Sequence, residues 1–344
     1  MKHLHLKRFG KFIFLFVNLS LFLFSCKIDE EKVNLTYDNI IIFSDMTNRL
    51  DNNLAQNLPT NDTVIINKIT DFFVSNCVQP GVKTNDRSSI SFSFLNPITY
   101  KIKKSKIDLE EEFPKSTDIG KKQAYVNSTC KTKNLKKDIE LFKNSIKNVY
   151  FNVYTAYKNK QDKFKNCGID AINLINEKIN NSNIIKQKTM ILGENDTTTI
   201  NFENHLIIFT DGYLEYNTIK AESSRYYGID KINKVRNFCI LNHCTPEDAI
   251  SKFQQPKLPK SFSKINRNVS IYILETNDRN FDKNTGSNKY ESDLTDNDIL
   301  KAVWKFWAKE SGFKKFVWQK INLNKNDIDL NYVNNILRKK KGFE

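Results

Sequence analysis

Three short apolar runs, each followed at once by polar residues, constrain the fold of this chain more than any other feature. They are NIIIF at 39–43, HLIIF at 205–209 and VSIYIL at 269–274. Runs that are apolar at consecutive positions suit strands buried on both faces, as in a parallel sheet covered by helices. The first run leads into Ser44-Asp45 and the second into Thr210-Asp211-Gly212. We therefore expect two of these strands to end in acidic turns.

Segments with apolar residues at helical spacing separate the runs, which favours helices between the strands. The expected helices lie at 62–73, 135–153, 169–179, 299–307 and 330–337. Further strands are expected at 89–95 and 316–323, an edge partner at 98–109, and a hairpin around 193–196. Strands that alternate with helices predict an α/β fold with a doubly wound, mostly parallel sheet flanked by helices. Ligands of such sheets bind outside the carboxyl ends of the strands, where the strand order reverses.

The N-terminal segment reads as an export signal rather than as part of this fold. Residues 1–25 begin with basic residues and continue with the apolar stretch 12–24, which is shorter than a transmembrane helix requires. They end in Leu23-Phe24-Ser25, and Cys26 follows; these four residues resemble the lipobox of bacterial lipoproteins. The resemblance implies a lipoprotein signal peptide over 1–25 and lipidation of Cys26. The protein would then be anchored to the outer membrane of the cell envelope, on its periplasmic or surface face.

Residues 26–37 would form the lipidated N-terminus and tether. The acid-rich stretch at 29–31 resembles the surface-export tether of some Bacteroidetes lipoproteins, and an ordinary solvated linker is the alternative.

The composition argues against several classes of function. The formal net charge is +15, yet the basic runs at 101–106 and 338–341 lack interleaved aromatic residues, which disfavours nucleic-acid binding. Five cysteines follow Cys26, so complete internal pairing is impossible, and Cys239 and Cys244 lack the second ligand pair of a zinc site. No Gly-rich phosphate loop and no Gly-x-Ser-x-Gly sequence is present. We expect no enzymatic activity.

The two acidic turns together resemble the von Willebrand factor A-type domain. Asp45-x-Thr47-x-Arg49 follows the first run and Thr210-Asp211-Gly212 follows the second. The family carries Asp-x-Ser-x-Ser after its first strand and Thr-Asp-Gly or Ser-Asp-Gly after its fourth. The resemblance implies one α/β domain of this type over 38–344, with insertions at about 97–133 and 213–266. It also implies a metal-ion-dependent adhesion site, where Mg²⁺ bridges to a carboxylate of a partner protein.

Carried over residue by residue, the resemblance makes Asp45, Thr47 and Asp211 ligands of Mg²⁺, which prefers hard oxygen donors. Thr210 would brace the loop, and Gly212 would allow close passage of the backbone.

The threonine that this family supplies from another loop has no direct counterpart in this chain. Asp170 is the favoured substitute, and the sequence Thr117-Asp118 is a competing candidate. Aspartates that follow strands also cap helices through backbone N–H groups, so Asp45, Asp170 and Asp211 have this plainer role as an alternative.

Arg49 departs from the family pattern, because it replaces the second serine of the motif. A guanidinium has no lone pair to offer a metal. Pointing inward, Arg49 would repel Mg²⁺ or take its place beside Asp45 and Asp211; pointing outward, it would leave a site with fewer ligands.

Three functions follow from these alternatives. The first is a cell-envelope lipoprotein that binds a partner protein through a divalent cation. The second is a metal-free structural or assembly lipoprotein that interacts through its insertions. The third is a hydrolase with a metal-activated water, which lacks a clear general base beside the loops.

Overall fold

A computed structural model describes most of the chain after residue 30, and all statements below concern the described residues. These are 31–46, 49, 58–78, 87–95, 100–114, 118–159, 170–181, 184–192, 196–215, 225–253, 256–261, 263–279, 281–282, 287–288, 294–322 and 324–338. The predicted signal peptide, Cys26, Thr47 and Thr117 lie outside them. No helix among the described residues is both long and apolar enough to cross a membrane.

The described chain divides into two units. The smaller unit comprises 31–36 and 188–201, and the larger comprises 37–187 and 202–338. In the smaller unit, β4 (Thr189–Leu192) pairs antiparallel with the first part of β5 (Asp196–Phe209), from Thr189 opposite Ile200 to Leu192 opposite Thr197. This pairing confirms the predicted hairpin. The unit also holds the first residues of β1 (Glu31–Ser44).

The larger unit contains the sheet, whose strands follow the order β3-β2-β1-β5-β6-β9. Its remaining strands are β2 (Ser89–Phe94), β3 (Lys106–Asp108), β6 (Val269–Thr276) and β9 (Lys315–Lys320). The pairs β1–β2, β5–β6 and β6–β9 are parallel, whereas the edge strand β3 runs antiparallel to its neighbour β2. The predicted α/β fold class is therefore confirmed. The strand order reverses between β1 and β5, where ligands of such sheets bind.

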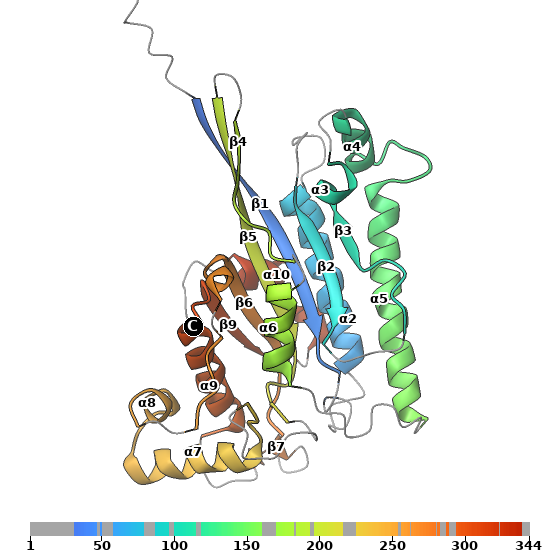
Figure 1. The fold of residues 1–344 in the computed structure, drawn as a ribbon. Coiled ribbons are helices and arrows are strands. Elements are labelled where there is room, and N and C mark those ends of the chain that lie inside the picture. The colour runs from blue at the N-terminus through green and yellow to red at the C-terminus, as the bar shows by residue number, and fades with distance from the viewer. Residues whose placement is uncertain are drawn as a thin grey trace, which may run out of the picture. The chain divides into compact units, whose positions relative to one another are not determined.

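Helices cover both faces of this sheet (Figure 1). One face packs against α2 (Leu58–Phe72), α5 (Leu135–Lys158) and α10 (Leu330–Leu337), with the π-helical turn Phe73–Val78 and α4 (Ile119–Val126) beside them. The other packs against α6 (Ala171–Asn181), α7 (Ile229–Asn242), α8 (Pro246–Ser251) and α9 (Asp296–Glu310). The described residues also include short elements: α3 (Leu109–Glu112), the ribbon β7–β8 (Phe281–Asp282 and Ser287–Asn288), and 3₁₀ turns at Lys264–Asn268 and Lys325–Asp327.

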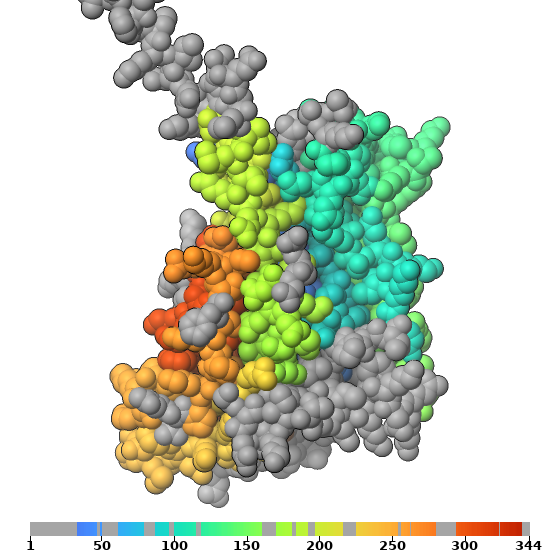
Figure 2. Space-filling model, in the orientation of Figure 1, coloured from blue at the N-terminus to red at the C-terminus, as the bar shows by residue number. Residues whose placement is uncertain are grey.

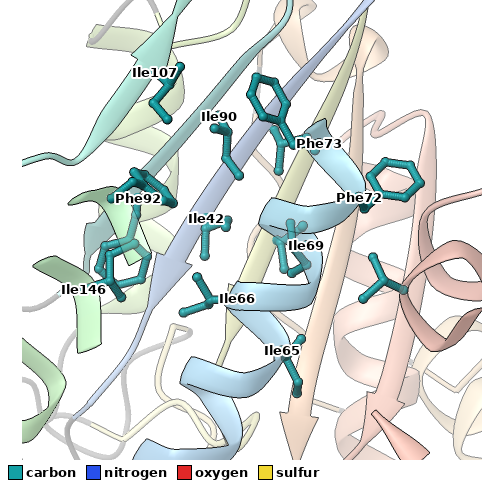
Figure 3. Packing of buried hydrophobic residues seen from close by; sticks show 14 of the residues in the cluster. Ile42, Ile65, Ile66, Ile69, Phe72, Phe73, Ile90, Phe92, Ile107 and Ile146 are labelled. Atoms are coloured by element: carbon teal, nitrogen blue, oxygen red, sulfur yellow. The ribbon is translucent and has the colours of Figure 1, made fainter. Parts of the chain in front are cut away.

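Alternation along the strands divides the apolar residues between two cores. In β1, Ile40 and Ile42 face the α2 side, whereas Ile41 and Phe43 face the α9 side. Figure 3 shows Ile42 together with isoleucine and phenylalanine side chains of α2. Because each face is buried, a slip of one residue would exchange the two side-chain sets and is strongly disfavoured. The consecutive apolar runs of the sequence are explained by this two-sided burial.

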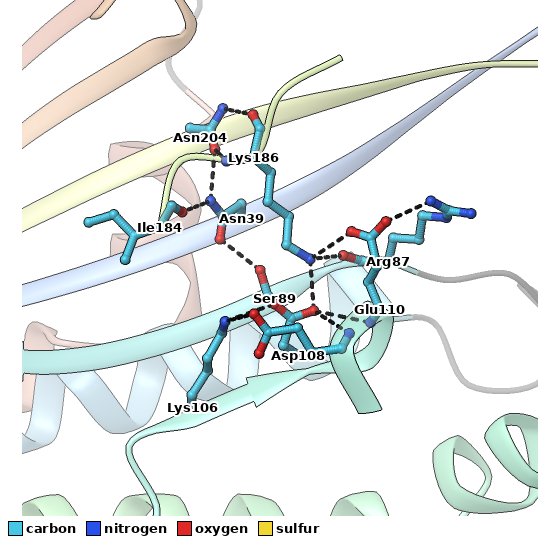
Figure 4. Close-up of polar contacts among 10 residues, drawn as sticks. Asn39, Arg87, Ser89, Lys106, Asp108, Glu110, Ile184, Lys186 and Asn204 are labelled. Atoms are coloured by element: carbon cyan, nitrogen blue, oxygen red, sulfur yellow. Dashed lines mark hydrogen bonds and ion pairs between the residues drawn. The ribbon is translucent and has the colours of Figure 1, made fainter. Parts of the chain in front are cut away.

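Buried amides bind the central strands to one another, as Figure 4 shows. The Nδ2 of Asn39 in β1 donates to Oδ1 of Asn204 in β5 at 2.7 Å, and the Ser89 hydroxyl of β2 donates to Oδ1 of Asn39 at 2.7 Å. The Nδ2 of Asn204 donates to the carbonyls of Lys186 and Asn268. These bonds join β2, β1 and β5 with the residue that precedes β6. Buried amides that satisfy one another favour a single strand alignment.

Candidate functional site

The two acidic turns predicted from the sequence lie side by side at the switch point between β1 and β5. The amide of Asp45 donates to the carbonyl of Phe209 at 2.9 Å, and the Thr210 hydroxyl donates to Oδ2 of Asp45 at 3.3 Å. Asp45, Thr210 and Asp211 are all buried. The carboxyl ends of β1 and β5 thus meet, as the alternating strands and helices predict.

Gly212 occupies a position that permits no side chain. Its φ is +93°, and a Cβ built there would lie 2.7 Å from the ring of Trp318. Its carbonyl accepts a hydrogen bond of 2.8 Å from the indole nitrogen of Trp304, and its amide donates to the Thr210 hydroxyl at 3.2 Å. Thr210 and Gly212 therefore brace the loop and let the backbone pass closely, the roles that the resemblance implies for them.

Arg279 neutralises Asp211. The guanidinium reaches Oδ2 of Asp211 with Nε at 3.1 Å and Nη2 at 2.5 Å, and its Nη1 lies 2.5 Å from Oε2 of Glu215. The same group stacks over the Tyr213 ring, 4.0 Å from its centre. Burial alone would lower the pKa of Arg279, but the charges of Asp211 and Glu215 outweigh it and raise that pKa above the ordinary value. Arg279 is therefore a fixed cation at this carboxylate.

Arg49 points inward, but its partner is Asp62 of α2, which the sequence analysis did not single out. The two side chains form a paired contact, Nη1 to Oδ2 at 2.8 Å and Nη2 to Oδ1 at 2.6 Å, and both are almost wholly buried. Arg49 touches Asp45 only at its backbone carbonyl, 3.2 Å away. The Tyr150 hydroxyl bonds both Oδ2 of Asp62 and the Ser44 hydroxyl. The guanidinium of Arg49 is therefore bonded to Asp62 and not to the carboxylate of Asp45.

A third arginine–aspartate pair lies near the second turn. Nη2 of Arg236 in α7 contacts Oδ1 of Asp296 at the start of α9, and both side chains are buried. The other oxygen of Asp296 accepts the Tyr213 hydroxyl at 2.7 Å, and that hydroxyl accepts the amide of Arg279 at 3.1 Å. Tyr213 therefore connects the Arg236 pair to the Arg279 pair.

The remaining predicted ligands have other surroundings or lie outside the described residues. Oδ1 of Asp170 accepts the amide of Asn173 in the first turn of α6, and its Oδ2 lies 2.9 Å from Arg225. Asp170 thus acts as a helix cap, the plainer of its two expected roles. Asp118 precedes α4 and lies 3.7 Å from Lys121. The structure does not describe Thr47.

A strained glutamate near the end of β6 is a feature that no sequence motif indicated. Glu275 is fully buried and has a φ of 64°, which L-residues other than glycine rarely adopt. Neither carboxyl oxygen makes a hydrogen bond of good geometry within the described chain, although Asn61 and the backbone of Asn322 lie beside it. Burial first, and then the charge of Asp62, raise the pKa of Glu275 to about 8, partly opposed by Arg49. Glu275 is therefore held as a neutral acid at neutral pH.

These contacts do not fit the predicted magnesium site. Asp211 is occupied by Arg279 and Asp170 by Arg225, and a guanidinium offers no lone pair to a metal. Within the part of the chain that the structure describes, no three His, Cys, Asp or Glu side chains come close enough to hold a metal ion. The edge of the sheet is instead neutralised by arginines.

No family model matches the sequence, and no curated protein is similar enough to count as a match.

The raised pKa of Glu275 predicts a pH-dependent stability. Between about pH 5 and pH 8 the folded protein keeps a proton that the unfolded chain has lost, so the free energy of unfolding falls as the pH rises, by up to about 1.4 kcal/mol per unit. Glu275→Gln should remove this slope, and its melting temperature should exceed that of the wild type more at pH 8 than at pH 5. Glu310→Gln, which removes an exposed carboxyl group, is the control. Parallel melting profiles for wild type and Glu275→Gln would contradict the assignment.

The role of Arg279 predicts that the fold does not need a metal ion. The melting temperature of the wild type should be the same in Mg²⁺ and in EDTA. Arg279→Ala should lower the free energy of unfolding by roughly 2–3 kcal/mol, because it leaves Asp211 buried without a counter-charge. The expected loss of unfolding free energy is smaller than for a fully buried pair, because the Arg279 side chain is 26% exposed.

Arg225→Ala provides the matched control, because it removes an arginine from the more exposed pair with Asp170 and should cost under about 1 kcal/mol. A rise in the wild-type melting temperature with Mg²⁺ that disappears in Asp211→Asn would instead establish a metal site.

Proposed function

We propose that this protein is a lipid-anchored protein of the bacterial cell envelope, and that its von Willebrand factor A-like domain binds a partner protein without a metal ion. The observation that carries the proposal is the contact of Arg279 with Asp211. The resemblance makes Asp211 a ligand of Mg²⁺, but the guanidinium of Arg279 already occupies its carboxylate.

The order of the sheet supports the von Willebrand factor A-like assignment. The chain runs outward from β1 through β2 to the antiparallel β3, and then from β5 through β6 to β9 on the other side. Asp45 and Thr210 meet at the reversal between the two halves. Such domains bind partners at this edge through a metal, and here two of the predicted metal ligands, Asp170 and Asp211, already have arginine partners. We therefore expect this domain to bind its partner protein through other surfaces.

The segment 213–266 supplies such a surface in α7 and α8. Leu241, near the end of α7, is 79% exposed and Ile240 is exposed as well, and Phe253, two residues after α8, is 51% exposed. Figure 2 shows these helices, in yellow to orange, at the surface of the larger unit. Large apolar side chains left exposed favour protein–protein contact, because their burial stabilises association. We therefore assign partner binding to the outer face of α7 and α8.

We assign no enzymatic activity. The hydrolase alternative needs a metal-activated water and a free general base beside the acidic turns. Asp211 is bonded to Arg279, and Asp62 to Arg49 and Tyr150, so neither of these carboxylates is available as that base.

Lipid anchoring predicts a dependence on Cys26. The wild type, expressed in a bacterium that processes lipoproteins, should partition into the detergent phase and incorporate labelled fatty acid. Cys26→Ala should do neither and should retain the signal peptide, which an intact mass measures. Cys130→Ala, which removes a cysteine from a helix connection, is the control. Fatty acid incorporation by Cys26→Ala would exclude the lipobox assignment.

Partner binding through α7 and α8 predicts crosslinks that depend on position. A photoreactive amino acid at residue 241 should give a discrete adduct in cells of the native organism. The same group at residue 151, an exposed phenylalanine position on α5, should give none. The adduct mass distinguishes a second copy of this chain from a different protein. Equal adducts at both positions, or none at residue 241, would remove this surface from the proposal.

A further inference from the structure

The C-terminal end of α7 brings two cysteines together. The amide of Cys244 donates to the carbonyl of Cys239 at 3.1 Å, and the amide of His243 donates to the carbonyl of Ile240 at 3.5 Å. These two bonds define the Schellman motif, in which the residues joined by the outer bond usually make a side-chain contact. An apolar pair normally fills these two positions, and both are cysteine here.

Both thiols lie against the same apolar core. Cys239 is buried in the cluster on the α9 side of the sheet, and Cys244 is partly buried against that cluster. Burial first, and then the charge and hydrogen-bonding contact of the Cys244 thiol, raise the pKa of Cys239 to about 12. The two sulfur atoms are therefore near neighbours, with Cys244 the more accessible.

The turn between the cysteines is strained. His243 has a φ of 46°, a conformation that glycine usually supplies at the end of a helix. A non-glycine residue holds such a conformation only when its surroundings fix it. A covalent bond between the side chains on either side of His243 would fix it.

We infer that Cys239 and Cys244 form a disulfide bond when the protein meets a small-molecule or protein disulfide as oxidant. The bond closes a short ring across the end of α7. It goes beyond the proposed function and does not depend on the lipid anchor or on the partner, because the oxidant can be supplied to the purified protein.

The chemistry is two successive thiol–disulfide exchanges. The thiolate of Cys244 attacks one sulfur of the oxidant, forms a mixed disulfide and expels the first thiolate. Cys239 then loses its proton and attacks the Cys244 sulfur, which expels the second thiolate. Two protons and two electrons leave the pair, and the oxidant is reduced to two thiols.

The bridge would act on the proposed contact surface. Ile240 and Leu241 are exposed and lie within the ring that the bond closes. Oxidation would therefore hold both side chains in one arrangement, and reduction would free the end of the helix.

The test uses the full mature chain carrying Cys130→Ser, because the partly exposed Cys130 thiol, with a pKa lowered to about 7 by Thr132, would itself react with the oxidant. The protein is equilibrated with oxidised and reduced glutathione, quenched with acid, unfolded, alkylated and digested with trypsin. Cleavage after Arg236 and Lys252 leaves both cysteines in one peptide. We expect this peptide to be about 2 Da lighter than the reduced form and unlabelled. Dithiothreitol should restore two labels.

Cys77 is the internal control, because it is buried in the core on the other face of the sheet and should be alkylated in full. Cys244→Ser should leave Cys239 alkylated under the same conditions. Two labels on the wild-type peptide at equilibrium would overturn the inference. A glutathione adduct retained on Cys244, or a bond from either residue to another cysteine, would overturn it equally.

Discussion

A carboxylate that is removed from water needs a counter-charge, and the carboxyl edge of this sheet is organised by that requirement. Asp62, Asp211 and Asp296 are buried, and each has an arginine partner from a different element. An uncompensated charge at any of these positions would cost several kcal/mol, comparable with much of the stability of a typical domain. Each pair therefore joins two parts of the chain: Arg49 to α2, Arg236 of α7 to α9, and Arg279 after β6 to the turn after β5.

The sequence predicts the layered fold well because burial on both faces leaves a simple signature. A strand such as 205–209 must be apolar at every position, and the helices 135–153 and 299–307 show the spacing of a single buried face. The structure places strands and helices over these segments. The sequence predicts a hairpin around 193–196 but not that its second arm continues as one strand to 209, because the residues between them are mostly polar and carry no such pattern.

The sequence predicts the two acidic turns of the site but not the side chains that neutralise them. Asp45 and Asp211 follow buried strands, so parallel pairing alone brings their turns together. Their charge partners have no comparable signal: Arg279 lies 68 residues beyond Asp211, and Asp62 is one of several polar residues at the start of α2. Glu275 follows an apolar run directly, but nothing in the sequence marks it as a buried and strained carboxyl group. Side-chain pairing between distant elements depends on packing that no local pattern records.

The separate origin of Arg49 and Arg279 has a consequence for how such a domain can change over time. Arg279 follows the third apolar run and would have to be lost before Asp211 could bind an ion, whereas Arg49 follows the first strand and is bonded to Asp62, which is not a predicted ligand. Any single replacement passes through a form with a buried aspartate left uncompensated. Loss of either arginine alone would therefore cost stability at once, so each arginine and its aspartate would have to change together.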